Sequence, residues 1–255
     1  MKENWIAYKT IVHKEVLRFT RIWLQTILPP IITTILYFII FGTLIGSQID
    51  DIKGVNYMEF LVPGLIMLGV IVQSYSNVVT SFFFAKFTKS IEEILVSPVP
   101  NWVIILGFVT GGAIRGLIVG FLIGLVSIFF TNFSIKYYFL TFFIAFLTAV
   151  LFSLIGLLNG IYAKKFDDIS LVPNFVLTPL TYLGGIFYSI SMLPQFWQYL
   201  SLLNPILYII NTFRYGMLEI TDINIYVSIF MILIFIFTFY FLALYLLNKG
   251  VRIKN

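Results

Sequence analysis

The sequence predicts an all-α integral membrane protein. Only 11% of the 255 residues are charged and 60% are apolar, whereas a soluble domain carries about a quarter charged residues. The charges are also clustered, so that five long stretches carry none. These stretches are Ile22–Ile49, Phe60–Ala85, Tyr137–Ala163, Ile169–Phe213 and Ile223–Asn248. A bilayer core about 30 Å thick is crossed by about 20 residues of apolar helix, so each stretch is long enough for a span.

Six spans are expected, joined by polar connectors. They are 22–46, 57–82, 101–130, 137–163, 169–188 and 224–247. The 16 Lys and Arg residues indicate the orientation, because basic residues gather on the cytoplasmic side of membrane proteins. With the N-terminus inside, twelve lie in cytoplasmic segments, three outside (Lys53, Lys136 and Arg214) and one, Arg115, within a span. We therefore expect a multi-pass membrane protein with both ends cytoplasmic. The net charge of +5 then reflects this bias rather than a nucleic-acid partner.

The uncharged stretch from Ile169 to Phe213 is too long for one span. About 45 residues of helix would extend about 68 Å, twice the length of one crossing. Two full spans would fit, but they would leave the basic C-terminal residues outside. One span at 169–188 followed by an outer re-entrant helical hairpin at 189–212 keeps those residues inside. Pro194 and the pair Asn204–Pro205 would break this hairpin, and we favour the re-entrant interpretation.

The N-terminal segment has the pattern of an amphipathic interfacial helix. One helical stripe is formed by Trp5, Tyr8, Val12, Val16 and Phe19. On the opposite side lie Lys14, Arg18 and Arg21. Such a helix is expected to place its aromatic side in the lipid and its cations on the headgroups. It could be a plain membrane anchor or a lever that joins a cytoplasmic partner to the first span.

The connector at 86–100 contains a short amphipathic helix. Ser90 and Glu93 have capping-box spacing, with Ser90 as N-cap. The candidate contact residues are Ser90, Ile91, Glu92, Glu93, Ile94, Leu95 and Val96. The apolar side, formed by Ile91, Ile94 and Leu95, could dock into a groove on a soluble partner or pack on the bundle.

The span at 101–130 carries a ridge of small residues and a charge. Gly112, Gly116, Gly120 and Gly124 recur at every fourth position, which lets another helix approach closely. The ridge could serve packing within the chain or a seam between two copies. Arg115 in the same helix is costly in lipid, so it should face protein or a wet conduit. It could act in that conduit or bond to helix carbonyls, and no acidic partner for it is evident.

Asp167 and Asp168 precede the fifth span. N-capping of that helix is the simplest explanation, and contact with a cytoplasmic partner is the alternative.

Several function classes are excluded by what the sequence lacks. No Gly is followed by Lys, so there is no phosphate-binding loop. There is no Cys and a single His, and no cluster suited to a metal. The spans also lack the acidic relay common in secondary transporters. We therefore expect that the chain is not an enzyme.

These residues together resemble the permease subunits of ABC-2-type transporters, particularly their YadH-like branch. The resemblance covers nearly the whole chain. It rests on Phe60–Leu65, Ser90–Pro100, the glycine-rich helix with Arg115, Phe166–Ile169, Leu177–Gly185, Asn204–Pro205 and Phe213–Gly216.

The resemblance implies a six-span subunit of the inner membrane, which works as a homodimer in the lipid bilayer with two copies of a separate ABC-type ATPase. Ser90–Val99 would be the coupling helix that docks on the ATPase, and the N-terminal helix would be the connecting helix. No cofactor would bind this chain, since Mg-ATP would belong to the partner. Export by alternating access is the implied function. A gradient-driven secondary transporter or channel is the alternative.

Overall fold

The computed structural model describes residues 2–49 and 51–250, and the side chains of Ser47 and Leu95 lie outside the described part. The predicted place of Leu95 on the apolar side of the connector helix therefore lies outside it too, as do Arg252 and Lys254 of the basic C-terminal segment.

Among the described residues, five helical segments are long and apolar enough to cross a membrane. The first combines α2 (Trp23–Thr26), α3 (Leu28–Tyr37) and the π-helical turns of η1 (Phe38–Ile45). The others are α4 (Tyr57–Phe87), α6 (Asn101–Ser127), α7 (Tyr138–Tyr162) and α12 (Ile225–Lys249). They correspond to five of the six predicted spans, although α4 runs on to Phe87, beyond the predicted end at residue 82.

The bundle is built around α4, which packs most extensively against α7 and α6. Within their most apolar windows, 78% of α4 residues and 72% of α6 residues are buried, against 17% in both the first and the last span. Close approach is possible because glycines face the neighbouring backbone. A Cβ on Gly156 of α7, for example, would lie 2.5 Å from the carbonyl oxygen of Tyr75 in α4. The first span and α12 therefore lie at the edge of the bundle, with faces that this chain leaves uncovered.

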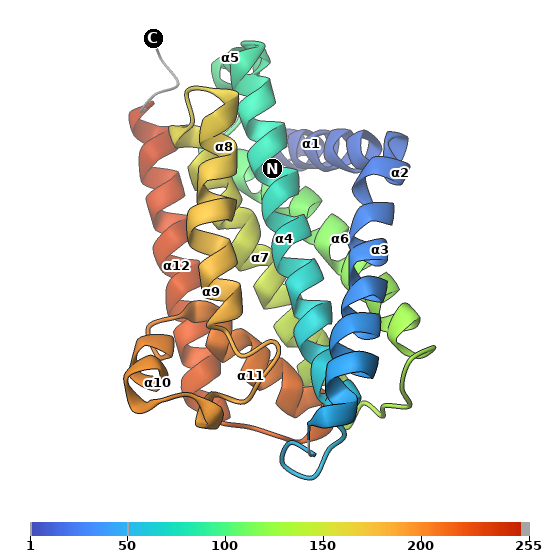
Figure 1. Ribbon diagram of the computed structural model, residues 1–255. Coiled ribbons are helices and arrows are strands. Elements are labelled where there is room, and N and C mark those ends of the chain that lie inside the picture. The colour runs from blue at the N-terminus through green and yellow to red at the C-terminus, as the bar shows by residue number, and fades with distance from the viewer. Residues whose placement is uncertain (1, 50, 251–255) are drawn as a thin grey trace.

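The sixth predicted span is represented by a shorter helical path. It runs without interruption through α8 (Phe166–Val172), the π-helical turn η3 (Pro173–Leu177) and α9 (Thr178–Tyr182), a path of 17 residues from 166 to 182. Beside α4 and α12 it descends from the end of the bundle that carries α5 (Ser90–Val96) (Figure 1). The helix stops at Leu183, and the backbone then turns at Gly185, whose φ is +76°.

The segment after Gly185 gathers at the opposite end of the bundle from α5 (Figure 1). It forms a 3-10 turn, η4 (Ile190–Met192), and two helices, α10 (Gln195–Ser201) and α11 (Pro205–Leu218). Helical structure is interrupted at Pro194 and at Asn204, while the re-entrant hairpin itself stays a prediction. Pro194 immediately precedes α10, and the side chain of Asn204 caps α11 by accepting a hydrogen bond from Ile206 N at 3.0 Å. Helix α11 packs on α12, α7 and α4.

Helix α1 (Lys2–Arg21) lies across the bundle near the α5 end (Figure 1) and packs on α6. The predicted orientation of this helix is wrong in part. Its buried residues are Ile11, Glu15 and Phe19, so Phe19 does not face lipid, and Arg18 turns toward α4 instead of away from the protein. The reason is that Gly107 and Gly111 of α6 have no side chains, so Ile11 and Glu15 pack directly against the α6 backbone there.

Candidate functional site

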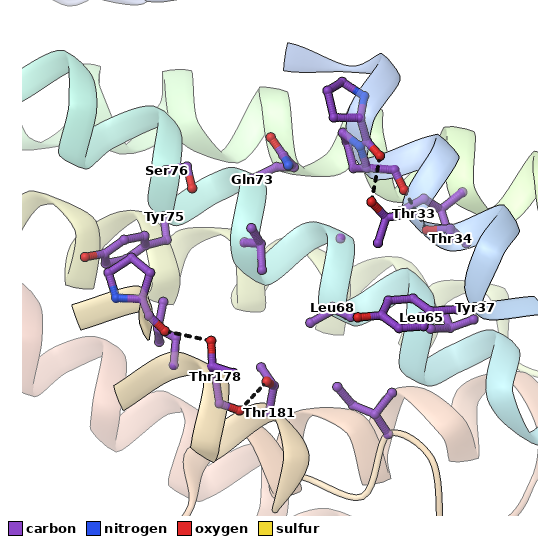
Figure 2. A pocket seen from close by; sticks show the side chains of 18 of the residues that line it. Thr33, Thr34, Tyr37, Leu65, Leu68, Gln73, Tyr75, Ser76, Thr178 and Thr181 are labelled. Carbon is purple, nitrogen blue, oxygen red and sulfur yellow. Dashed lines mark hydrogen bonds between the residues drawn. The ribbon is translucent and has the colours of Figure 1, made fainter. Parts of the chain in front are cut away.

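A cavity of about 440 Å³ opens between α3, α4 and the α8–α9 path. Its polar wall comes from all three segments: Thr33, Thr34 and Tyr37, then Gln73, Tyr75 and Ser76, then Asn174, Thr178, Thr181 and Tyr182. Figure 2 shows Gln73 and Ser76 of α4 on one side of the opening and Thr178 and Thr181 of α9 on the other. Apolar side chains, including Leu65, Leu68 and Ile123, complete the lining.

The four threonine hydroxyl groups of the cavity are already bonded to their own helices. Thr33 and Thr34 donate to the carbonyl oxygens of Pro29 and Pro30, at 2.9 and 2.8 Å. Thr178 and Thr181 donate to those of Pro173 and Thr178, at 2.9 and 2.7 Å, as the dashed lines in Figure 2 show for several of these bonds. Because their protons are engaged, these side chains offer the cavity methyl groups and acceptor lone pairs. The wall is polar but contains no nucleophile with an adjacent base.

An aromatic cluster includes two residues of the cavity lining, Tyr37 and Phe187. The Phe187 ring stacks on Phe41 at 4.7 Å between centroids and meets the edge of Tyr37 at 5.6 Å. Two side chains hold the segment that carries Phe187. Tyr57 Oη donates to the Phe187 carbonyl at 3.0 Å, and Arg214 Nη2 donates to the Gly185 carbonyl at 2.6 Å.

The same segment is also tied to the loops around it. Asp222 accepts hydrogen bonds from Ser189 Oγ at 2.6 Å and from Lys53 Nζ at 2.5 Å. Burial alone would raise the pKa of the Asp222 carboxyl, but the bonds from Lys53 and Ser189 outweigh it and hold that pKa below its usual range. Three loops distant in sequence are thus joined at this carboxylate.

Arg115 lies directly behind the cavity wall. It is buried, and its Nη2 donates to Gln73 Oε1 at 2.5 Å, while longer contacts of 3.5 Å reach Asn77 Oδ1 and the Thr26 carbonyl. Arg115 thus bonds to one helix carbonyl, as one of the two sequence interpretations has it, and mainly to side-chain amides. Gln73 itself lines the cavity, so Arg115 is one side chain away from it.

The acidic member of this cluster was not among the predicted site residues, because it comes from α1 and not from a span. Glu15 is fully buried and accepts hydrogen bonds from Ser81 Oγ and from Arg18 Nη2, the latter at 3.2 Å. Arg18 Nη2 also donates to Asn77 Oδ1 at 2.8 Å, and Asn77 in turn contacts Arg115. The available signal was the placement of Ile11, Glu15 and Arg18 on one helical face, opposite glycines spaced four apart at 107 and 111.

The glycine ridge of α6 packs within the chain. A Cβ on Gly112 would overlap Ser153 and Val78, and one on Gly116 would overlap Ser74 and lie 3.0 Å from the Val70 carbonyl. One on Gly120 would lie 2.5 Å from Val70 Cγ2. The face that carries these glycines is thus covered by α4 and α7.

The connector helix α5 projects from one end of the bundle (Figure 1). Ile91 is buried and anchors it, whereas Glu92 and Glu93 are exposed and Val96 is 86% exposed. The predicted capping box is wrong: the N-cap residue is Lys89, in a left-handed conformation, and Ser90 lies inside the first turn. The physical reason is the length of α4, which leaves two residues to reverse the chain. Ser90 Oγ donates back to the Ala85 carbonyl at 3.2 Å.

Asp168 does cap its helix, from the third position of the first turn. Its Oδ2 accepts hydrogen bonds from the backbone N–H groups of Lys164 and Lys165, at 2.7 and 3.0 Å. Asp167 is exposed beside it.

Comparison with known proteins identifies the class of protein that carries this architecture. The family described as ABC-2 type transporter matches residues 6–218. The chain belongs to this family. It is 56% identical over 246 residues to "Inner membrane transport permease YadH" of Escherichia coli strain K12, covering 96% of each chain, and to the same degree to that of Shigella flexneri. It is 22% identical over 247 residues to "Nodulation protein J" of Rhizobium meliloti, covering 96% of this chain and 93% of that one.

Family membership makes the chain the permease subunit of an ABC-2 type transporter. The family is not catalytic, in agreement with a cavity lined by hydroxyl, amide and apolar groups. It also sets aside the gradient-driven transporter or channel, because an ABC permease works with an ATPase partner.

Proposed function

We propose that this chain forms half of the export pathway of an inner-membrane transporter and that a separate ATPase drives it through α5. The observation that carries the proposal is the exposure pattern of α5. Ile91 fixes the helix to the bundle, while Glu92, Glu93 and Val96 remain exposed at its tip. A short helix that is anchored at one residue and exposes both charged and apolar side chains can bind in a groove of a soluble partner. Mg-ATP would bind only to that partner.

The topology we propose has six crossings. The path 166–182 starts near the α5 end and stops near α11 (Figure 1), so we assign it as the fifth crossing, with the residues up to 188 completing it. Helices α10 and α11 then form the outer re-entrant hairpin, and α12 returns to the α5 side. Both ends are cytoplasmic in this arrangement, because the positively charged segments gather with α1 and α5.

We propose that two copies pair so that the cavities face a common conduit. Only 17% of the most apolar window of the first span is buried within one chain, and this span forms one wall of the cavity. A second copy placed against α3 and the α8–α9 path would cover that wall and enclose the threonine and tyrosine side chains. The glycine ridge is not needed for this seam, since α4 and α7 cover it.

At the cytoplasmic end, α1 and the exposed Asp167 would complete the contact with the ATPase. The ionic cluster of Glu15, Arg18 and Arg115 joins α1 firmly to α4 and α6. Movement of the ATPase would therefore reach the cavity wall through two rigid elements, α5 and α1. Lipid would contact the outer faces of α12 and the first span.

The proposal is tested by reversing the charge of α5. The tagged chain is co-expressed with its ABC ATPase, and both the amount of ATPase that co-purifies and ATP hydrolysis are measured. Glu92→Lys combined with Glu93→Lys should strongly reduce both while leaving insertion unchanged. Asp51→Lys, an exposed charge reversal at the other end of the bundle, is the matched control. Undiminished ATPase recovery with the double variant would refute α5 as the contact.

A further inference from the structure

The ionic cluster behind the cavity carries an excess positive charge. It contains two guanidinium groups, Arg18 and Arg115, and one carboxylate, Glu15. Glu15 forms its ion pair with Arg18, at 3.2 Å. Among the residues that the structure describes, no carboxylate lies within ion-pair distance of Arg115, and its buried Nε has no hydrogen-bond partner. A buried cation without a counter-ion favours an anion nearby.

Gln73 lies between the Arg115 guanidinium and the cavity, and its amide group is polarised by the positive charge of Arg115. A guanidinium can only donate hydrogen bonds, so the Gln73 atom that faces Arg115 Nη2 at 2.5 Å has to be the amide oxygen. The two N–H donors of Gln73 are then at the other end of the amide. Because Gln73 lines the cavity, it can present to the interior a donor that is polarised by the positive charge behind it.

The cavity has other donors, namely Ser76, Asn174 and its tyrosine hydroxyls, but Gln73 is the one whose amide is hydrogen-bonded to a buried guanidinium. Among the described residues that line it, none is charged. The hydroxyls of Thr33, Thr34 and Thr178 donate to their own helices and leave acceptor lone pairs toward the cavity. These acceptors do not stabilise negative charge. An acidic group would therefore be held at Gln73, and the apolar remainder of the molecule would lie against the Leu65, Leu68 and Ile123 side of the cavity.

From this arrangement we infer that the cavity takes an amphipathic acid: an apolar body with one carboxylate, sulfonate or phosphate group bound at Gln73. The inference rests on the proposed role of the cavity as the conduit and names the chemical class of its substrate. The shared chemistry is an acidic head on an apolar body, which either a membrane phospholipid or a smaller amphiphile can supply.

The experiment compares two fluorescent probes that differ in a single charged group. 1-Anilinonaphthalene-8-sulfonate carries a sulfonate, and N-phenyl-1-naphthylamine is the same molecule without it. The full chain is reconstituted in phosphatidylcholine nanodiscs, and binding of each probe is measured by fluorescence titration. Thr178→Trp is the background control: its indole ring fills the exposed side of the cavity, so the fluorescence that remains comes from probe bound elsewhere. We expect the sulfonate probe to bind in the cavity about tenfold more tightly than the neutral probe.

Two variants of Gln73 locate the effect. Gln73→Glu keeps an oxygen toward Arg115 and neutralises its charge, so it should remove the preference for the sulfonate probe and leave binding of the neutral probe unchanged. Gln73→Met preserves the volume but removes the donor, and should also weaken binding of the sulfonate probe.

Addition of phosphatidylglycerol to the nanodiscs identifies the source of the acidic group. Competition with the sulfonate probe in the wild type but not in Gln73→Glu supports a lipid acid, and no competition supports a smaller amphiphile.

Equal affinity of the two probes in the wild type would overturn the inference, as would a sulfonate preference that survives both Gln73 variants. Either result leaves the permease proposal standing, because α5 docking is measured separately. A signal unchanged by Thr178→Trp would instead contradict the cavity as a binding site. Chain purity and size-exclusion behaviour of each variant establish that the fold is retained.

Discussion

Arg18 of the crosswise helix α1 donates to both oxygens of Asn77 in α4, to the side-chain Oδ1 at 2.8 Å and to the main-chain carbonyl at 2.9 Å. These two hydrogen bonds to one residue fix α1 to α4. The buried carboxylate of Glu15 adds to them by accepting hydrogen bonds from Asn77 and Ser81 of α4. Of the two sequence interpretations of this helix, a lever needs such a fixed connection and a plain anchor does not.

Loss of the Glu15 carboxylate should destabilise the protein severely. Glu15→Ala leaves Arg115 and Arg18 in the cluster without an anion. Breaking a fully buried pair from one side costs about 3–5 kcal/mol, and this is the upper limit here because the Arg18 side chain is 28% exposed. A large fall in the thermal denaturation temperature of the detergent-solubilised chain is expected. Glu3→Ala, an exposed carboxylate on the same helix, should stay close to wild type. Similar stability of the two variants would show that the cluster contributes nothing.

The glycines of α6 should differ sharply in their tolerance of alanine. Gly116→Ala would overlap Ser74 and press on the Val70 carbonyl, so we expect a loss of about 1–3 kcal/mol. At Gly124 the nearest contact of a new Cβ is Ile66 Cδ1 at an ordinary 3.6 Å. Gly124→Ala should therefore be neutral or stabilising by up to about 1 kcal/mol, since Ala is the better helix former. Denaturant unfolding of the two variants side by side makes the comparison, and equal losses would contradict the packing described here.

The carboxylate that joins the outer loops should make them sensitive to acid. The pKa of Asp222 is lowered in the folded protein from its ordinary value of 3.8. A lowered folded-state pKa means that the stabilisation is complete above the ordinary value and is lost as pH falls through the folded value. Hydrogen exchange at Ser189 and Ile190 should thus accelerate relative to the bundle below pH 3.8. With Asp222→Asn this exchange should already be fast at neutral pH and show no further step.

Substitutions at Ile91 and Val96 should have different effects, because Ile91 anchors α5 to the bundle and Val96 belongs to the surface proposed to contact the ATPase. Ile91 is 1% exposed and Val96 86% exposed. Ile91→Ala should loosen α5 and increase its cleavage in limited proteolysis of the chain alone. Val96→Asp should leave that cleavage unchanged and reduce ATP hydrolysis by the assembled transporter. If Val96→Asp also opened α5 to protease, the exposed tip would be structural rather than a docking surface.

The proposed seam can be mapped by cross-linking, because the chain contains no Cys. A single Cys at the exposed position Leu36 of α3 should form a disulfide between two copies in membranes. A Cys at Phe237, an equally apolar and exposed position on α12, should not. Cross-linking at Phe237 but not Leu36 would place the seam on the opposite edge of the bundle. The readout is the dimer band on a non-reducing gel.

The membrane spans and the chain breaks could be predicted because the cause is local. An uncharged apolar run of about 20 residues is stable in lipid only as a helix. Pro194 directly precedes α10 and Pro205 is the first residue of α11, positions at which a proline is tolerated and at which helices commonly begin. The five long helices and both breaks follow from these facts. The 17-residue path through α8 and α9 is shorter than the predicted span at 169–188, since Gly184–Gly185 ends it early.

The sequence by itself determined the class of protein, the places where helices run, and which residues share a helical face. Only the tertiary structure decided which face is covered. Helix α1 carries aromatic and charged residues on both sides, and Gly107 and Gly111, far along the chain, select the side with Glu15. Arg115 likewise has its hydrogen-bond partners on α4 and at Thr26 of α2, not on its own span. The physical reason is that helical periodicity is a property of one segment, whereas burial of a charge depends on a partner brought near only by folding.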